Sequence, residues 1–147
     1  MTAQSEQAQY LSVLTQIPSA ALKVFTEEIL MQFDHVQVVE NRTGLVMLPY
    51  TDSVKGTAFH LGEVLMSEAL VTVQDQHGYG ACLGRDLEQA LAIAILDATL
   101  QLQDAARWSG LQAKVSHFVE EQAAAQQLAD CELLRKVEAT RVEMEVF

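Results

Sequence analysis

Apolar side chains recur at helical spacing near the start of the chain. One stripe predicts a short amphipathic helix over about 5–17, and a second stripe predicts another over about 20–33. Pro18 separates the two stripes, because proline disrupts a helix interior. We therefore expect residues 1–33 to form a helical arm.

After Asp34 the pattern changes to short runs of β-branched residues, which are typical of strands. Residues 41–44 carry turn-forming types, so they predict a turn between two short strands, the second of which ends at Pro49. A hairpin turn is predicted at 76–78. The expected strands are 35–40, 45–48, 64–74 and 79–83, with 56–61 as a short strand or an irregular segment. Close turns between short strands favour an antiparallel meander.

The second half of the chain reads as mostly helical. Residues 87–107 predict a helix that is apolar on almost every side as far as Leu102, which is typical of a central, buried helix. Residues 108–110, Trp-Ser-Gly, predict its end, and 111–137 predict a long C-terminal helix. The last residues, 140–147, alternate between apolar and polar side chains, which indicates a strand-like tail.

These elements predict an α+β fold in which a small antiparallel sheet is packed by a central buried helix. N-terminal helices and a long C-terminal helix flank this unit. We expect a single domain over 1–147, made of the helical arm 1–33, a sheet-plus-helix core 35–108, and a C-terminal helix with its tail, 111–147.

Composition narrows the possible functions. Hydrophobic residues make up 50% of the 147 residues, which excludes wholesale disorder. The net charge of -11 at pH 7 argues against nucleic acid as a partner, because phosphate contacts need Lys and Arg. The same charge argues against binding to anionic membranes. We expect neither partner.

The sequence also favours a cytoplasmic location. The first nine residues are polar, which predicts no signal peptide, and no apolar run approaches the ~20 residues of a membrane-spanning helix. Cys82 and Cys131 form no C-x-x-C pair, and we interpret both as small core residues in a reducing compartment.

Common catalytic and metal-binding motifs are missing from the sequence. It has no phosphate-binding loop, no dinucleotide fingerprint and no H-E-x-x-H or G-x-S-x-G motif. No two histidines lie three or four positions apart. His117 with Glu120 and Glu121 resembles a solvated acidic helix face more than a metal site. We predict no catalytic residue, no metal and no cofactor in this chain.

Three cations at predicted turns are candidates for an anion site, namely Arg85, Arg42 and Lys55. Arg85 lies beside the expected first turn of the 87–107 helix, where free N–H groups attract anions. The alternative is that Asp86 is simply the N-cap of this helix, followed by Gln89 as in a capping box, and that Arg85 pairs with a nearby acid.

Two further features need partners. Asp97 lies within the apolar helix and, if it points inward, must be paired or hydrogen-bonded. We expect a structural partner such as an Arg rather than a role for Asp97 as a catalytic acid. In the tail, Val142, Met144 and Val146 share one face. They are candidates for binding a partner subunit, or the tail pairs with the chain's own sheet.

Several stretches together resemble a known family. They are Arg42–Val46, Phe59–Leu65, Gly78-Tyr79, Gly84–Asp86, Ala94–Ala98 and Ala139–Glu143. This ordered set, over about 42–103 plus the tail, is similar to the G subunit of the bacterial carbon–phosphorus lyase core complex. Family members often have an aromatic residue where Ala81 stands, and some have a basic residue near Glu68, so ligand contacts there do not carry over.

The resemblance implies a partner-dependent function in phosphonate catabolism. It implies assembly with subunits H, I and J, and support for making α-D-ribose 1-methylphosphonate 5-triphosphate from methylphosphonate and MgATP, which is a substrate of the complex. It attaches no catalytic role to this subunit. A chain of charge -11 is also a poor solitary binder of triphosphate.

Two other hypotheses remain beside the subunit. One is a stand-alone small-molecule binding or regulatory domain. The other is a hydrolase that uses Asp86 or Asp97, which ranks last because the sequence shows no nucleophile–base pair. A subunit should expose an apolar surface larger than the ~300–600 Å² of a typical monomer.

Overall fold

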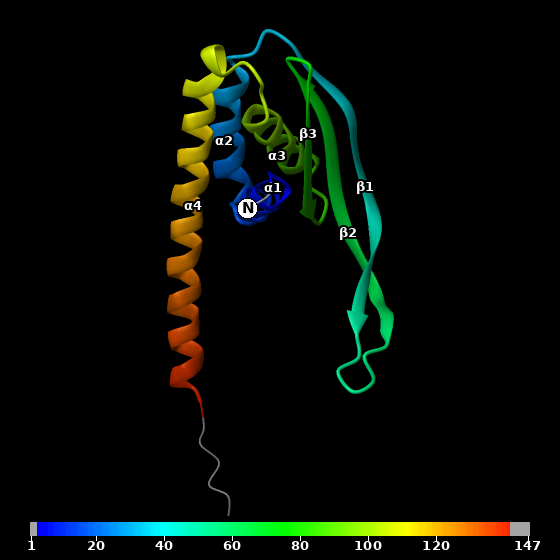
Figure 1. Ribbon diagram of the computed structural model, residues 1–147. Helices are drawn as coiled ribbons and strands as arrows, with labels where there is room; N and C mark the ends of the chain where they lie inside the picture. Colours follow the sequence, from blue (N-terminus) through cyan, green and yellow to red (C-terminus); the bar gives the residue numbers. More distant parts are fainter. Residues whose placement is uncertain (1–2, 142–147) are drawn as a thin grey trace, which may run out of the picture.

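A computed structural model of the chain describes residues 3–141. Its elements are α1 (Ala3–Gln16), α2 (Ser19–Leu30), β1 (Val36–Thr51), β2 (Ala58–Val73), β3 (Gln76–Leu83), α3 (Leu87–Leu100) and α4 (Ala105–Ala139). The strands form one antiparallel sheet in the order β1-β2-β3, and the helices lie on one side of it (Figure 1). The predicted α+β class is confirmed.

Helix α3 is the centre of the core, as its apolar sequence predicts. It packs on β2 and β3, and its residues from Ala92 to Thr99 are all buried. Two glycines of β3 make this contact close. A Cβ atom added at Gly78 would lie 2.1 Å from the backbone oxygen of Ala94, and one at Gly80 would lie 2.3 Å from that of Ala90. The helix therefore rests directly on the β3 backbone.

The N-terminal helices close the core on the other side of α3. Leu14, Ile17, Leu22 and Ile29 are almost completely buried there. Between α2 and α4, the rings of Phe25 and Phe118 stack with centroids 3.8 Å apart. The predicted helical arm is thus part of the same packed core.

The first hairpin differs from the prediction. Residues 41–44 form no turn, because β1 continues through them for 16 residues and pairs with β2 along its whole length. Gly44 does not have a positive φ angle, and Pro49 lies at a register shift that accommodates its missing N–H. The turn between β2 and β3 is at Gln74 and Asp75, whose φ angles are positive, and not at 76–78.

The boundary between the last two helices was also predicted wrongly. Helix α3 ends at Leu100, and residues 108–110 lie within the first turns of α4. Asp104 starts α4, since its carboxylate accepts a hydrogen bond from the backbone N–H of Arg107. The amide of Gln112 donates to three carbonyl oxygens between residues 99 and 102. These hydrogen bonds stabilise the break between α3 and α4, although the apolar pattern of the sequence continues to Leu102.

Two parts of the molecule extend beyond the core in the same direction (Figure 1). The first is the distal hairpin, residues 44–65 of β1 and β2 with their connecting loop, which lies beyond the β3 pairing that starts at Met66. The second is the C-terminal half of α4, where Leu128, Leu133, Leu134 and Val137 are all more than half exposed. The tail residues 142–147, including Val142, Met144 and Val146, lie outside the described residues.

Helix α4 is long, but its sequence is largely polar, with a buried stripe at Trp108, Val115 and Val119. Within residues 3–141, no helix combines the length and the apolar character required to cross a membrane.

Candidate functional site

The two faces of the sheet have different surroundings. Side chains alternate between the faces of a strand, so the register assigns each residue to one of them. The face toward α3 carries Ala69, Val71 and Val73, all buried. We call the opposite side the open face. Its residues are Gln37, Glu40, Arg42, Gly44, Val46, Leu48 and Tyr50 of β1, Phe59, Gly62, Val64, Met66, Glu68, Leu70 and Thr72 of β2, and His77, Tyr79, Ala81 and Leu83 of β3.

The open face is largely apolar and exposed. Val46, Tyr50 and Tyr79 are about half exposed, and Leu83 is 72% exposed. Among residues 3–141, no helix covers these side chains, because the helices all lie on the other side of the sheet (Figure 1). Contiguous apolar surface of this kind is typical of a binding interface.

The distal hairpin is apolar on both of its faces. Leu45 and Met47, which point to the same side of the sheet as α3 but lie beyond it, are more than half exposed. Tyr50 and Phe59 pair across the strands with their rings edge to face, 5.7 Å between centroids. A hairpin with apolar side chains on both faces is suited to burial within another protein.

A polar cluster lies within the open face. The guanidinium of Arg42 binds the carboxylate of Glu68 through Nε at 2.6 Å and that of Glu40 at 2.8 Å. The hydroxyl of Tyr79 donates to the second oxygen of Glu68 at 3.1 Å. These groups adjoin a hollow of about 390 Å³, whose lining includes Arg42, Glu68, Tyr79 and Ala81. The cluster thus carries two carboxylates and one guanidinium.

The pKa values in this cluster follow from its contacts. The hydrogen bond from Arg42, and next that from Tyr79, lowers the pKa of Glu68. Partial burial, and then the hydrogen bond to Glu68, raises the pKa of Tyr79. Glu68 is therefore ionised at neutral pH, and Tyr79 keeps its proton as a donor.

The three predicted anion-binding cations do not form one site. Arg42 lies in the middle of β1, where two carboxylates neutralise it, and not at a turn. Lys55 lies in the loop beyond the end of β1, and β1 itself continues nine residues past Arg42 to Thr51, or roughly 30 Å. Arg85 is exposed between β3 and α3, and within the described part of the chain it forms no ion pair.

Asp86 is the N-cap residue of α3. Its carboxylate accepts hydrogen bonds from the backbone N–H of Gln89 at 2.8 Å and from the hydroxyl of Ser19 at 2.6 Å. Because Ser19, and then the Gln89 N–H, stabilise the ionised form, the pKa of Asp86 is lowered. The capping box is incomplete, since the Gln89 amide binds the carbonyl oxygen of Ile17 instead of returning to Asp86.

Asp97 is buried, but the predicted arginine partner is wrong. Its carboxylate accepts hydrogen bonds from the hydroxyl of Tyr10 at 2.6 Å, the amide of Gln7 at 3.0 Å and the backbone N–H of Tyr79 at 2.8 Å. Burial, followed by the contact with Asp97, raises the pKa of Tyr10 well above its usual range. These three donors fasten α1 and β3 to α3, which is a structural arrangement.

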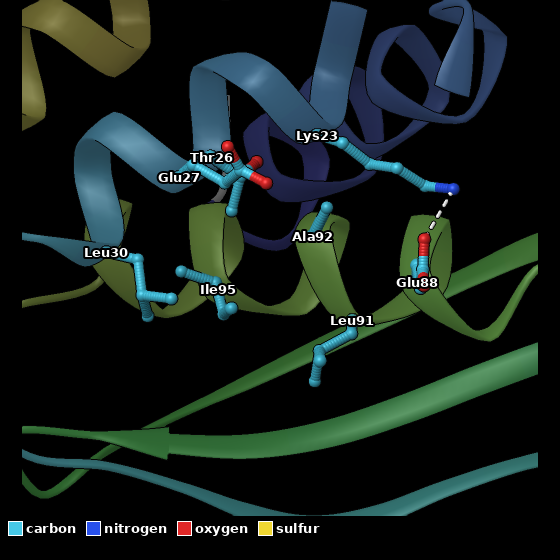
Figure 2. Close-up of a pocket in the computed structure, with 8 residues that line it drawn as sticks. All are labelled: Lys23, Thr26, Glu27, Leu30, Glu88, Leu91, Ala92 and Ile95. Carbon is cyan, nitrogen blue, oxygen red and sulfur yellow. Dashed lines mark ion pairs between the residues drawn. The ribbon is translucent and has the colours of Figure 1, made fainter. Parts of the chain in front are cut away.

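A second hollow of about 230 Å³ lies between α2 and α3 (Figure 2). Figure 2 shows Lys23 reaching from α2 toward Glu88, to which it is bound at 2.8 Å, and Lys23 also lies 3.4 Å from Asp86. Leu30, Leu91 and Ile95 supply apolar lining. Since Lys23 is the only cation among the lining residues and two carboxylates neutralise it, the hollow is unsuited to phosphate.

The remaining metal and thiol candidates are isolated. His117 lies 3.6 Å from Glu121 on the exposed surface of α4, and residues 3–141 contain no group of three or more acidic, His or Cys side chains placed to hold a metal ion. Cys82 is buried, and its burial raises the pKa of its thiol. Cys131 is exposed on α4, so the prediction that it is a core residue was wrong.

Sequence reasoning identified Arg42, Glu68 and Ala81 separately but missed the open face that unites them. Its signal was present in the continuous apolar run from Leu45 to Tyr50, and in Phe59 on the paired strand. The predicted turn at 41–44 divided the strand and so separated Arg42 from that run.

Two comparisons with known proteins show what the chain is similar to. A family model described as phosphonate metabolism protein PhnG matches residues 5–147. In Stutzerimonas stutzeri, a protein named "Putative C-P lyase subunit protein HtxH" is 36% identical over 78 residues. That match covers 46% of this chain and 21% of the relative, so it spans about a fifth of the relative's length.

Proposed function

This chain belongs to the family of phosphonate metabolism protein PhnG, and from that membership we propose that it is a non-catalytic subunit of a carbon–phosphorus lyase complex. Its role is to hold partner subunits together during phosphonate catabolism. The similarity to a relative named as a C-P lyase subunit supports this assignment.

The observation that carries the proposal is the uncovered apolar surface of the open face and distal hairpin. The exposed patch includes Val46, Tyr50 and Phe59. When another protein covers it, the free energy falls by about 25 cal/mol per Å² of apolar surface removed from water. The partners we propose are subunits H, I and J of the complex, in the cytoplasm.

The polar groups support a structural role in this chain. The cations Arg42 and Lys23 are each neutralised by two carboxylates, and the acids Asp86 and Asp97 are engaged in hydrogen bonds within the fold. We therefore propose that MgATP and methylphosphonate bind other subunits, and that the complex as a whole forms α-D-ribose 1-methylphosphonate 5-triphosphate.

The C-terminal half of α4 is a second proposed contact. Its exposed leucines lie within residues 127–139, which are exposed throughout, and such a helical segment gains stability when a partner covers it. The tail residues Val142, Met144 and Val146 follow this segment, and their binding to a partner subunit stays a prediction.

The proposal is tested by recovering the tagged chain from its native host and identifying what accompanies it by mass spectrometry. We expect subunits H, I and J in the eluate. The purified chain alone should release no adenine from MgATP and methylphosphonate, while the recovered complex should. Adenine release by the chain alone would contradict its non-catalytic role.

The alternative function, a stand-alone small-molecule binding domain, rests on the hollow of about 390 Å³ in the open face. It predicts that the chain elutes alone and that a small ligand raises its melting temperature. The exposed apolar side chains around that hollow favour the subunit over this alternative.

A further inference from the structure

We propose that the protein segment covering the open face contributes a cationic side chain, Arg or Lys, which binds Glu40. This inference rests on the proposed function, because it specifies the chemistry of the partner that the open face receives. It concerns Glu40, Arg42 and Glu68, which lie beside the apolar residues of the open face.

The argument begins with the charge of this cluster. Two carboxylates surround one guanidinium, so the cluster keeps one uncompensated negative charge. In the free chain, water solvates this charge, since the side chains of Arg42 and Glu40 are 63% and 44% exposed. A partner that covers the open face removes that water, and an unpaired charge in a desolvated interface is costly. A cation from the partner offsets this cost.

The hydrogen bonds indicate which carboxylate receives the cation. Both oxygens of Glu68 are already engaged, one by Arg42 and the other by the hydroxyl of Tyr79. Glu40 uses one oxygen for Arg42, and among the described residues its other oxygen has no partner. Glu40 pairs with Leu70 across the strands, so the free oxygen lies beside apolar surface that a partner would cover.

The same charge argues against a second copy of this chain as the occupant. Two open faces packed together would bring two negative clusters into one interface, and each copy carries a net charge of -11. Like charges across an interface oppose association. A partner with a basic segment fits the face, whereas a second copy does not.

The test titrates the full chain, immobilised on a surface, with the co-purified mixture of subunits H, I and J. Four variants are compared with the unmodified chain. Glu40→Gln removes the free carboxylate, Glu40→Lys reverses its charge, and Val46→Asp disrupts the apolar part of the open face. Glu120→Lys is the control, because Glu120 is an exposed acid on α4, away from the sheet.

We expect Glu40→Gln to weaken binding about tenfold, and Glu40→Lys to weaken it further, as for a charge pair within an interface. Binding of the unmodified chain should weaken as salt rises from about 50 to about 500 mM, because salt screens the pair, and Glu40→Gln should reduce that dependence. Glu120→Lys should bind as the unmodified chain does. Circular dichroism and thermal melting check that each variant is folded, so that weaker binding reflects a change in the interface.

The outcomes separate this inference from the proposed function. If both Glu40 variants bind normally while Val46→Asp fails, the open face docks without a cation and the inference is wrong. Normal binding by Val46→Asp excludes the open face altogether. If the unmodified chain binds no subunit, the proposed function itself fails. A dimer of the isolated chain that Val46→Asp dissociates would make a second copy the occupant.

Discussion

The two faces of the sheet are built from the same strands, yet they differ in what covers them. On the face toward α3, Gly78 and Gly80 bring the helix backbone into contact with β3, and Val71 and Val73 are fully buried. On the open face, Tyr79 and Leu83 alternate with those glycines and remain exposed. Both faces are apolar, but only one is covered within the described chain.

This difference separates what folds the chain from what we propose it does. The covered face leaves no space for a larger side chain, because side chains and backbone already fill it. The open face tolerates change in the isolated chain, since a Cβ atom added at Gly44 meets no atom within 4 Å. Substitutions on the two faces should therefore affect different measurements, namely stability for one and assembly for the other.

The largest expected effect comes from adding one methyl group to the covered face. Gly80→Ala places a Cβ atom 2.3 Å from the backbone oxygen of Ala90, so α3 must move away from the sheet. We expect the free energy of unfolding to fall by about 3 kcal/mol. Gly44→Ala on the open face is the control and should change it by less than about 0.5 kcal/mol. Chemical denaturation measures both, and equal losses would refute the distinction between the faces.

A second large effect is expected at the buried carboxylate. Asp97→Ala leaves the hydroxyl of Tyr10, the amide of Gln7 and the N–H of Tyr79 without their acceptor. The free energy of unfolding should fall by about 2–3 kcal/mol, because buried donors are costly to leave unpaired. Asp130→Ala, at an exposed acid on α4, should be nearly neutral. A small loss at Asp97 would mean that water replaces the missing acceptor.

A smaller, pH-dependent effect is expected at the cap of α3. The pKa of Asp86 is lowered in the folded chain, so its carboxylate stabilises the fold above the unfolded pKa of about 3.9. That stabilisation is lost as pH falls through the folded pKa. Asp86→Asn keeps the shape and removes the titrating group, and we expect it to cost about 1 kcal/mol near pH 7, because the helix N-terminus favours a negative charge.

Thermal melting from pH 7 down to about pH 2 tests this sign. The unmodified chain should lose its advantage over Asp86→Asn as the pH falls below about 4. A constant difference between the two chains across this range would mean that the charge of Asp86 contributes nothing.

The smallest effect is expected at Arg85. The sequence suggested that Arg85 pairs with an acid beside the helix cap, so that its removal would lower thermal stability. The side chain is exposed and forms no ion pair within residues 3–141. Arg85→Ala should therefore change the free energy of unfolding by less than about 0.5 kcal/mol in denaturation experiments. A clearly larger loss would restore the predicted pairing.

The sequence predicted best what depends on local pattern. The apolar composition of 87–100 predicts a buried helix, and Asp86 precedes it at the cap position. The predictions failed where contacts between residues far apart in the sequence determine the structure. The pairing of Arg42 with Glu68 extends β1 through a segment of turn-forming residues, and the Gln112 amide stabilises the end of α3 two residues before the apolar pattern ends at Leu102.

The site was harder to predict than the fold. Alternation shows that a strand has two faces, but it does not show which face a helix covers. That choice depends on Gly78 and Gly80, which admit α3 on one side only. The partners of Asp97 were also out of reach, because Gln7 and Tyr10 lie 90 and 87 residues away in the sequence.

The central claim is that the open face is covered when the chain assembles with its partner subunits. Hydroxyl-radical footprinting of the isolated chain and of the purified complex tests it directly. We expect Tyr50 and Tyr79, which are 55% and 45% exposed in the isolated chain, to react at least about fivefold more slowly in the complex. Met31, which is 82% exposed at the end of α2, should react equally in both. Unchanged labelling of Tyr50 and Tyr79, together with protection of Met31, would contradict the account.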